Sequence, residues 1–223
     1  MKTKVCLLTL LFLNSVAMLH AQAVFSFEGG LDGWTTSGFN AKPASLGVSP
    51  TGATDGAQAL FITQTGDGFS WNASRTSSNA TPDAFYAAMN TAAANESLWT
   101  LEFDVTYVNV EIPDAGFLNL SLWINSDNGF RDIHGLGTTS TLADETRHVT
   151  IPFSSFSGGP DTLATSSSFY QMGIAMNGNW GSGDATIHVD KIQVVPEPST
   201  GLLVLASLFV VFAARRRHNQ NVA

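Results

Sequence analysis

The sequence predicts an all-β domain, an antiparallel β-sandwich with one short helix, and three observations predict it. Four segments alternate apolar and polar residues with a period of two, which is typical of strands that bury one face. Clusters of Gly, Asn, Asp and Ser, typical of turns, separate these segments. Strands do not alternate with helices, as they do in a parallel sheet. A closed barrel is the alternative architecture. The segments are residues 101–107, 118–124, 148–153 and 170–176.

Further elements complete the expected sandwich. One helix is expected between Thr81 and Asn95, because Thr81 can cap it and Pro82 suits its first position. Its apolar residues form one stripe, so we expect the helix to pack over one end of the sandwich. That stripe consists of Phe85, Ala88, Met89 and Ala92. The weaker strand candidates are residues 24–27, 59–63, 69–73 and 186–194.

The first 23 residues have the layout of a secretory signal peptide. Two lysines precede an apolar run, and Ala21 and Ala23 form the pattern of small residues that signal peptidase requires. We expect export and cleavage after Ala23, with a buried N-terminal helix as the alternative. The single cysteine, Cys6, lies in this segment, so the exported chain is expected to form no disulfide.

The C-terminal segment, residues 196–223, has three parts. A Pro-Glu-Pro tripeptide precedes the uncharged segment 199–214, and three arginines open the basic tail 215–223. Residues 201–214 span only about 21 Å as a helix, but the arginines favour the cytoplasmic side of a membrane helix. We therefore expect a transmembrane helix at 199–214, with a buried C-terminal helix as the alternative. The flanking residues are Pro196, Glu197, Pro198, Arg215, Arg216 and Arg217.

This order of tripeptide, apolar helix and arginine cluster resembles the PEP-CTERM sorting signal. The resemblance implies an envelope protein of a Gram-negative bacterium, whose signal is recognised and cleaved by an exosortase, a membrane cysteine transpeptidase. It also implies anchoring in the inner membrane before processing, then a place in the cell envelope or outside the cell. Proteins with this signal are usually linked to extracellular polysaccharide or biofilm matrix.

The charge of the segment between the two ends limits its partners. Residues 24–195 hold five of the ten basic and 17 of the 18 acidic residues, so they carry a formal charge of −12. Nucleic-acid binding requires clustered positive charge and is excluded as a function class. The same charge disfavours anionic polymers and favours cations.

Two short segments of the body resemble jelly-roll carbohydrate-binding modules of the galactose-binding-like class. Residues 25–34 are similar to the opening of such modules, and residues 186–194 to their last strand. The resemblance implies a jelly-roll β-sandwich in which these two strands lie near each other. It indicates sugar binding less strongly than fold, because many domains with one fold differ in function.

Asp190 interrupts the apolar pattern of residues 186–194. Ile187 and Val189 lie in one phase of the alternation and Ile192 in the other, so a bulge is expected at Asp190. A carboxylate among apolar strand residues needs a partner. In similar modules this partner is often a structural Ca²⁺. The matching positions here are Glu28, the turn carbonyls at Gly30, and Asp190, and oxygen ligands suit calcium. Alternatively, Asp190 pairs with Lys191 or with backbone amides, and Glu28 caps a turn.

Several aromatic residues are candidates for stacking on sugar rings. Trp123 and Phe117 lie out of phase with the apolar set 118–124, so we expect them on an outer face. Trp71 and Trp180 lie in loop-like segments, and Asn119 and Arg131, with His148 and Gln171, are candidates to hydrogen-bond the hydroxyls. Alternatively, these rings only pack, and the helix segment covers Trp123.

No pattern in the sequence indicates an active site. The histidines lack the spacing of metal ligands, and Gly-x-Ser-x-Gly and phosphate-binding loops do not occur. The acidic pair Glu102 and Asp104 lies on the polar face of a strand, which indicates a solvated surface rather than a glycosidase pair. We therefore predict a non-catalytic module that binds exopolysaccharide. A structural surface protein with no small ligand is the alternative, followed by a glycan-active enzyme.

Overall fold

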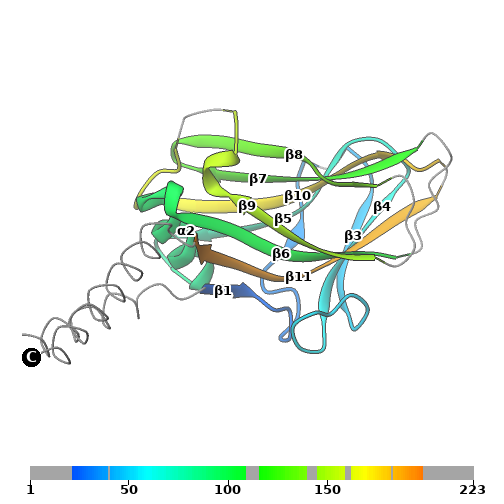
Figure 1. Cartoon of the computed structure of the whole chain (residues 1–223), viewed down its shortest axis with the longest axis horizontal. Coiled ribbons are helices and arrows are strands. Elements are labelled where there is room, and N and C mark those ends of the chain that lie inside the picture. Colours follow the sequence, from blue (N-terminus) through cyan, green and yellow to red (C-terminus); the bar gives the residue numbers. More distant parts are fainter. Residues whose placement is uncertain are drawn as a thin grey trace, which may run out of the picture.

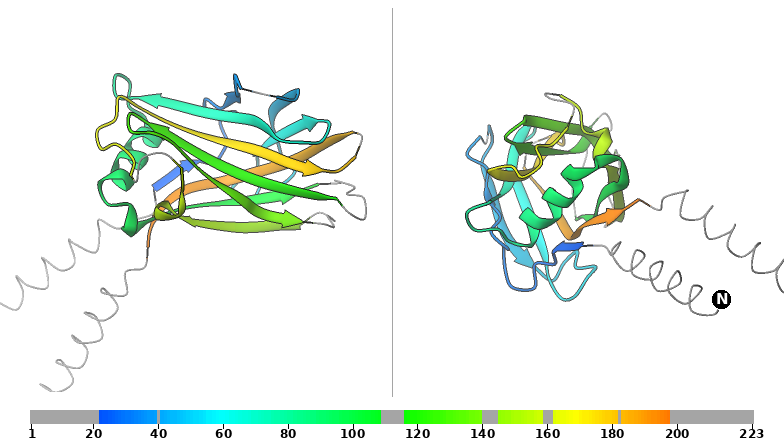
Figure 2. Two further views of the ribbon diagram at one scale, coloured as in Figure 1. Left: turned by 90° about the horizontal axis from the view of Figure 1, so that it is seen from above. Right: turned by 90° about the vertical axis from the view of Figure 1, so that its left-hand side faces the viewer.

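The computed structural model describes residues 22–39, 41–108, 116–139, 145–158, 162–181 and 183–197. Two antiparallel sheets face each other across the core, with helix α2 (Ala84–Ala94) at one end (Figures 1 and 2). The first sheet contains β1 (Gln22–Phe25), β3 (Ala44–Ser49), β4 (Ala59–Thr65), β6 (Trp99–Tyr107), β9 (Glu145–Pro152) and β11 (Asp184–Pro196). The second contains β2 (Thr35–Thr36), β5 (Ser70–Ser78), β7 (Phe117–Ser126), β8 (Gly129–Thr139) and β10 (Phe169–Asn179).

The order of the strands confirms the predicted antiparallel β-sandwich with one short helix. The first sheet runs β3-β4-β11-β6-β9, with β1 also paired to β11, and the second runs β2-β5-β10-β7-β8. Strands β1 and β11 are neighbours, as the resemblance to jelly-roll modules implied. The last strand therefore lies in the middle of its sheet and is paired on both sides.

The core lies between the sheets and consists of the predicted apolar phases. Leu101, Phe103, Val105 and Tyr107 on β6 are each at most 1% exposed, and the alternate residues of β7 and β10 face them. Trp34 and Trp99 are buried, as expected for packing residues. The aromatic side chains bury most area per residue and therefore dominate the stability of this core.

Helix α2 covers one end of the sandwich and buries its predicted stripe (Figure 2). The expected cap at Thr81 was wrong, because the helix begins at Ala84 and its N-cap is Asp83. The Asp83 carboxylate accepts the N–H of Tyr86 at 2.9 Å, which satisfies a donor that the first helical turn leaves free. Thr81 instead forms an isolated bridge with Ser78. Two short 3₁₀ helices, η1 (Glu96–Leu98) and η2 (Phe153–Ser155), lie beside β6 and β9.

The predicted bulge at Asp190 is confirmed. The pairing of β11 with β6 shifts between Asp190, opposite Asp104, and Gln193, opposite Glu102. Lys191 has a φ of 52°, an unusual value for a residue other than glycine, and it provides the extra residue. The bulge lies where the neighbour of β11 changes from β4 to β1.

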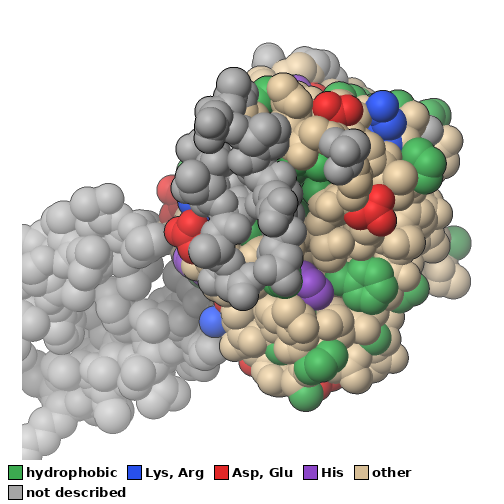
Figure 3. Space-filling model, turned by 90° about the vertical axis from the view of Figure 1, so that its right-hand side faces the viewer, with side chains coloured by type: hydrophobic (Ala, Val, Ile, Leu, Met, Phe, Trp, Pro, Cys, Tyr) green, Lys and Arg blue, Asp and Glu red, His purple; other side chains and the backbone are tan. Residues whose placement is uncertain are grey.

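Much of the predicted terminal organisation lies outside the described residues. This holds for residues 1–21 of the predicted signal peptide, the transmembrane helix at 199–214 and the basic tail 215–223. Among the helices that the structure describes, none is long and apolar enough to cross a membrane. At the end of the sandwich opposite α2, acidic and hydrophobic side chains are scattered rather than gathered into one patch (Figure 3).

Candidate functional site

The outer face of the second sheet brings together five of the residues expected to contact a sugar: Phe117, Asn119, Trp123, Trp71 and Gln171. On β7, Phe117, Asn119 and Trp123 point away from the core, because the alternate residues of this strand are buried in it. Trp71 on β5 lies opposite Ala175 of β10, in the same phase. The register of two neighbouring pairs of strands thus places residues that are distant in sequence on one surface.

Four rings form an aromatic cluster on this face, defined as Phe69, Trp71, Trp123 and Phe130. Trp71 makes edge contacts with the other three rings, with centroids 4.8 to 5.9 Å apart. Phe130 stacks on Trp123 with centroids 5.7 Å apart and an interplanar angle of 30°. Such geometries are the favourable ones for aromatic pairs, so the cluster is held in place before any ligand arrives.

The expectation that Trp123 is exposed was wrong, since only 3% of it is accessible. Its indole lies over Gly173 of β10, where a Cβ would come within 2.2 Å of the ring. Phe130, from the β7–β8 hairpin, packs over Trp123 and is itself 39% exposed. Trp71 is half-buried. Trp71 and Phe130 therefore present the accessible part of the cluster, and Trp123 supports them.

Paired amides flank the aromatic cluster along β7 and β10. Asn125 lies opposite Gln171, and Asn119 lies opposite Asn177, on either side of the Trp123–Gly173 pair. All four side chains are half-buried, so their polar atoms lie at the surface of the face rather than in the core. Amides offer both donors and acceptors, which suits the hydroxyl groups of a neutral ligand.

A hydrogen-bonded chain of three polar residues lies at the β8 side of this face. Nδ1 of His134 is 3.0 Å from Oγ of Ser121, and its Nε2 is 3.0 Å from Oδ2 of Asp132. The His134 side chain is 60% exposed, whereas Ser121 is buried. Because Ser121 is closed to solvent, the arrangement orients the imidazole rather than presenting a nucleophile. No sequence pattern predicted this group, because it depends on a register shift of β8 beside Ser121.

Three of the expected contact residues lie elsewhere. Trp180 is 5% exposed and belongs to the core, where it packs against Gly178. Arg131 is 2% exposed, and its Nη1 and Nη2 donate to both carboxylate oxygens of Glu96, at 3.0 and 2.8 Å. Glu96 also accepts the N–H of Leu163. The pair of Arg131 and Glu96 therefore holds η1 against the segment at Leu163, which follows η2 in the chain. Similarly, His148 lies on β9 of the first sheet, 2.7 Å from Asp104.

The residues expected to bind calcium hold the loop between β3 and β4. Oε1 of Glu28 accepts the N–H groups of Ala57 and Gln58, at 2.7 and 2.9 Å. The fully buried Asp190 accepts the N–H groups of Thr54 and Asp55, at 2.7 and 2.8 Å.

Lys191 also donates its N–H to Asp190, at 2.7 Å, as the alternative interpretation anticipated. Gly30 lies in a turn and donates its own N–H to the carbonyl of Phe27. Within the described ranges, no three His, Cys, Asp or Glu residues are grouped so that they could hold a metal. The oxygens of Glu28 and Asp190 that face the loop accept backbone N–H groups, so both carboxylates already fix the loop by hydrogen bonds.

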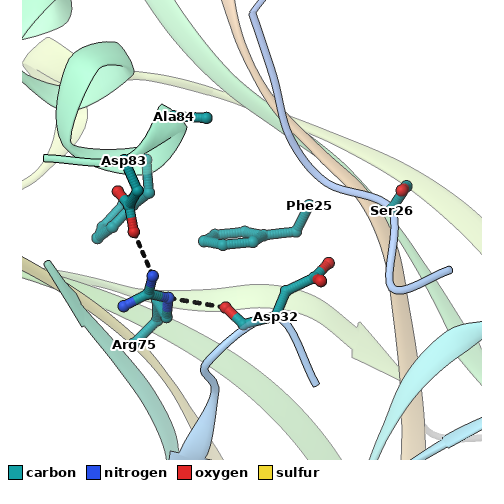
Figure 4. Close-up of a pocket in the computed structure, with 7 residues that line it drawn as sticks. Phe25, Ser26, Asp32, Arg75, Asp83 and Ala84 are labelled. Atoms are coloured by element: carbon teal, nitrogen blue, oxygen red, sulfur yellow. Dashed lines mark hydrogen bonds and ion pairs between the residues drawn. The ribbon is translucent and has the colours of Figure 1, made fainter. Parts of the chain in front are cut away.

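A small hollow of about 270 Å³ lies beside the start of α2 (Figure 4). Arg75 lies between Asp83 and the loop at Asp32, pairing with the carboxylate of Asp83 and donating Nε to the carbonyl of Asp32 at 2.8 Å. Burial raises the pKa of Asp83, but the Tyr86 N–H, Ser77 and Arg75 together lower it more. The charged groups of this hollow thus join α2 to β5.

Comparison with known proteins bears on the two parts of the chain separately. Residues 194–217 match the family model of the PEP-CTERM protein-sorting motif. The chain carries a PEP-CTERM motif. This confirms the resemblance seen at the C-terminus and indicates export through the exosortase system. A search of curated proteins gives no match to this chain.

Two solved structures share the fold of the body. One is a carbohydrate-binding module from the β-sandwich superfamily, described as promiscuous in specificity, with a TM-score of 0.51 and 19% identity over 79% of this chain. The alignment spans only 63% of that structure's length. The other is the family 11 carbohydrate-binding module of the cellulosomal cellulase Lic26A-Cel5E of Clostridium thermocellum, with a TM-score of 0.51, 17% identity, and coverage of 80% of this chain and 95% of that one. These similarities confirm the β-sandwich fold.

The PEP-CTERM motif begins inside this fold. Pro196 ends β11 opposite Trp99, and the N–H of Glu197 donates to the carbonyl of Leu98 at 2.7 Å. Pro198 and the arginines at 215–217 lie outside the described residues. The described part of the motif is therefore part of the sandwich.

Proposed function

We propose that this exported domain binds a carbohydrate chain, without catalysis, on the outer face of the second sheet. The observation that carries the proposal is the aromatic cluster, with the accessible rings of Trp71 and Phe130, together with the amide pairs on either side of the Trp123–Gly173 pair. Flat rings pack against the C–H faces of sugars, and polar groups placed around them fix orientation and specificity. The likeness in fold to carbohydrate-binding modules supports this assignment.

The charge of the domain favours a neutral polysaccharide. Residues 24–195 carry a formal charge of −12, so an anionic polymer is repelled as it approaches. The two cations beside the amide pairs by register are both paired with acids: Arg131 is buried and pairs with Glu96, and Arg75 pairs with Asp83. The polar groups of the described face are mostly amides and hydroxyls, which match sugar hydroxyls better than carboxylates or sulfates.

A glycan array with the full chain in detergent tests the proposal, followed by calorimetric titration of the best neutral glycan. Trp71→Ala and Phe130→Ala should each weaken binding at least about tenfold, ~1.4 kcal/mol. Leu98→Ala is the matched control, because Leu98 is 41% exposed but lies on η1 at the end of the sandwich. Equal affinities for all three variants would overturn the proposed face.

The second candidate is a structural surface protein with the same fold and no small ligand. The burial of Trp123 and Trp180 favours it, because fewer rings are accessible than the sequence suggested. If the folded chain binds no glycan on the array, the structural role is the correct one.

We further propose that the chain is made with a cleaved signal peptide and anchored in the inner membrane by its C-terminal helix. The exosortase then releases it into the envelope or the extracellular matrix. The PEP-CTERM match supports this route. Intact-mass measurement of the protein in membrane and culture fractions tests it, since cleavage at each end changes the mass. The structural calcium ion at Glu28, Gly30 and Asp190 stays a prediction from the resemblance.

A further inference from the structure

The sorting motif and the sandwich share residues. The family match starts at Val194, which is 1% exposed and belongs to the core. Val194, Val195 and Pro196 pair with Leu101, Thr100 and Trp99 of β6. The hydroxyl of Thr100 also donates to the carbonyl of Val195 at 3.2 Å.

The same end of β11 is paired on its other side as well. Val194 lies opposite Gln22 of β1, so β11 is a central strand up to this residue. Beyond Val194 the strand retains only β6 as a neighbour among the described residues. Pro196 has no N–H to donate, so the ladder weakens there, and the bond from Glu197 to Leu98 closes the pairing. In Figure 1 this end of β11 lies near α2, beside the start of β1.

We infer that the sandwich and the processing enzyme compete for residues 194–197, so that the fold withholds this part of the PEP-CTERM motif until the end of β11 separates from β6. The inference rests on the proposed exosortase processing. A transpeptidase that takes its substrate as an extended peptide needs the backbone groups of the motif, and β6 occupies several of them. Strand ends open locally at a lower free energy than the whole domain, which gives the enzyme access at a reduced rate.

A cross-strand disulfide tests the competition. Thr100→Cys with Val195→Cys joins residues that are paired in register and leaves Pro196 and Glu197 unchanged. The control pair is Thr63→Cys with Thr186→Cys, at the other end of β11, where the two hydroxyls lie 2.8 Å apart. Residues 24–223 contain no cysteine, so each introduced pair forms a single bridge within the domain.

Pulse-chase in the host, with the mass of the chain as readout, should show the locked variant processed at least about tenfold more slowly, ~1.4 kcal/mol. Reductant should restore its rate, and the control pair should match the unmodified chain. A short Gly-Ser insertion between Val195 and Pro196, which frees Pro196 and Glu197 from β6, should accelerate processing.

The outcomes separate the two proposals. If the unmodified chain keeps its C-terminal tail, the proposed processing fails and the inference fails with it. If the unmodified chain is processed but the oxidised Thr100–Val195 pair and the control pair are processed equally fast, only the competition is overturned. An insertion variant processed no faster than the unmodified chain also overturns it, which keeps the test decisive where the disulfide disturbs folding.

Discussion

The carboxylate of Asp190 accepts a hydrogen bond of 2.7 Å from the backbone N–H of Thr54, although 136 residues separate the two in sequence. The same oxygen accepts the N–H of Asp55 at 2.8 Å. Asp190 occupies the bulge of the central strand, and through these bonds the bulge fixes the loop between β3 and β4. The burial of this carboxylate is thereby compensated by donors of the chain itself.

Asp190→Ala should destabilise the fold by about 1–3 kcal/mol, because it removes the buried acceptor shared by the backbone N–H groups of Thr54 and Asp55. Urea unfolding followed by far-UV circular dichroism measures the change. Asp190→Asn keeps one acceptor oxygen and should lose less. Asp184→Asn is the control, since Asp184 is exposed at the start of the same strand and should leave the midpoint unchanged.

The predicted calcium ion would bind beside the same loop, and thermal unfolding tests it. Binding to the folded state alone raises its stability by about 2.7 kcal/mol at a free concentration of 100 Kd. Calcium must therefore raise the melting temperature, a chelator must reverse the rise, and Glu28→Gln must abolish it. If neither calcium nor chelator changes the melting temperature, the prediction of the ion is wrong. Glu28 and Asp190 then act only as hydrogen-bond acceptors.

Gly173→Ala should damage both the sheet face and the proposed binding. Its Cβ would approach the Trp123 indole to 2.2 Å, so the ring must move and the contact with Phe130 must break. We expect a loss of about 1–3 kcal/mol in stability, as for overpacking of a well-packed site, together with a change in tryptophan fluorescence. Gly38→Ala is the matched control, because no atom lies within 4 Å of the added Cβ. An unaltered emission spectrum would contradict the proposed support of the cluster by Trp123.

Arg131→Met should cost about 3–5 kcal/mol, because it leaves the buried carboxylate of Glu96 without its charged partner. The double variant Arg131→Met with Glu96→Gln should recover part of this loss, since neither charge then remains in the interior. Guanidinium unfolding of the four members of the cycle gives the coupling energy. The distances of 2.8 and 3.0 Å indicate a coupled pair. If the stability losses of the two single variants add up to that of the double variant, the pair is not coupled.

The stability of the domain should fall as the pH drops below neutrality because of His188. Burial lowers the pKa of His188, and the hydrogen bond with Thr51 opposes this only in part. The unfolded chain therefore binds a proton at a higher pH than the folded chain, and stability is lost as the pH falls below the ordinary histidine pKa of about 6.5. His188→Gln should reduce the difference between urea midpoints at about pH 7.5 and about pH 5.5. An equal difference in the His188→Gln variant and in the unmodified chain would contradict this assignment.

The sequence predicted the parts of the fold that follow from local periodicity. The alternation at Leu101–Tyr107 predicted a core strand, and the change of phase at Asp190 predicted the bulge. Strands β2, β3 and β8 lie at sheet edges and were not predicted. Strand β2 has only two residues, β8 does not alternate regularly, and β3 has a short apolar phase, Leu46 and Val48, that is only half-buried. In β3, Gly47 has no side chain, and Phe61 of β4 occupies the space that a Cβ would need. Phe61 belongs to a neighbouring strand, so the sequence of β3 alone does not show that the space beside Gly47 is filled.

For the candidate site, the sequence predicted which side chains point away from the core, but not which of them are accessible. Period-two alternation was enough to place Phe117, Asn119 and Trp123 outside the core. It could not show that Phe130 folds back over Trp123, because this depends on where the β7–β8 hairpin turns. Arg131 was misassigned for the same kind of reason, since its partner Glu96 lies 35 residues away, beyond the end of α2.

The position of β11 also has a mechanical consequence. Its hydrogen bonds to β4 and β6 run perpendicular to the strand, so tension applied along the strand loads many of them at once, in shear. Force applied along β11 from its C-terminal end is therefore resisted by many of these bonds together rather than by one bond after another.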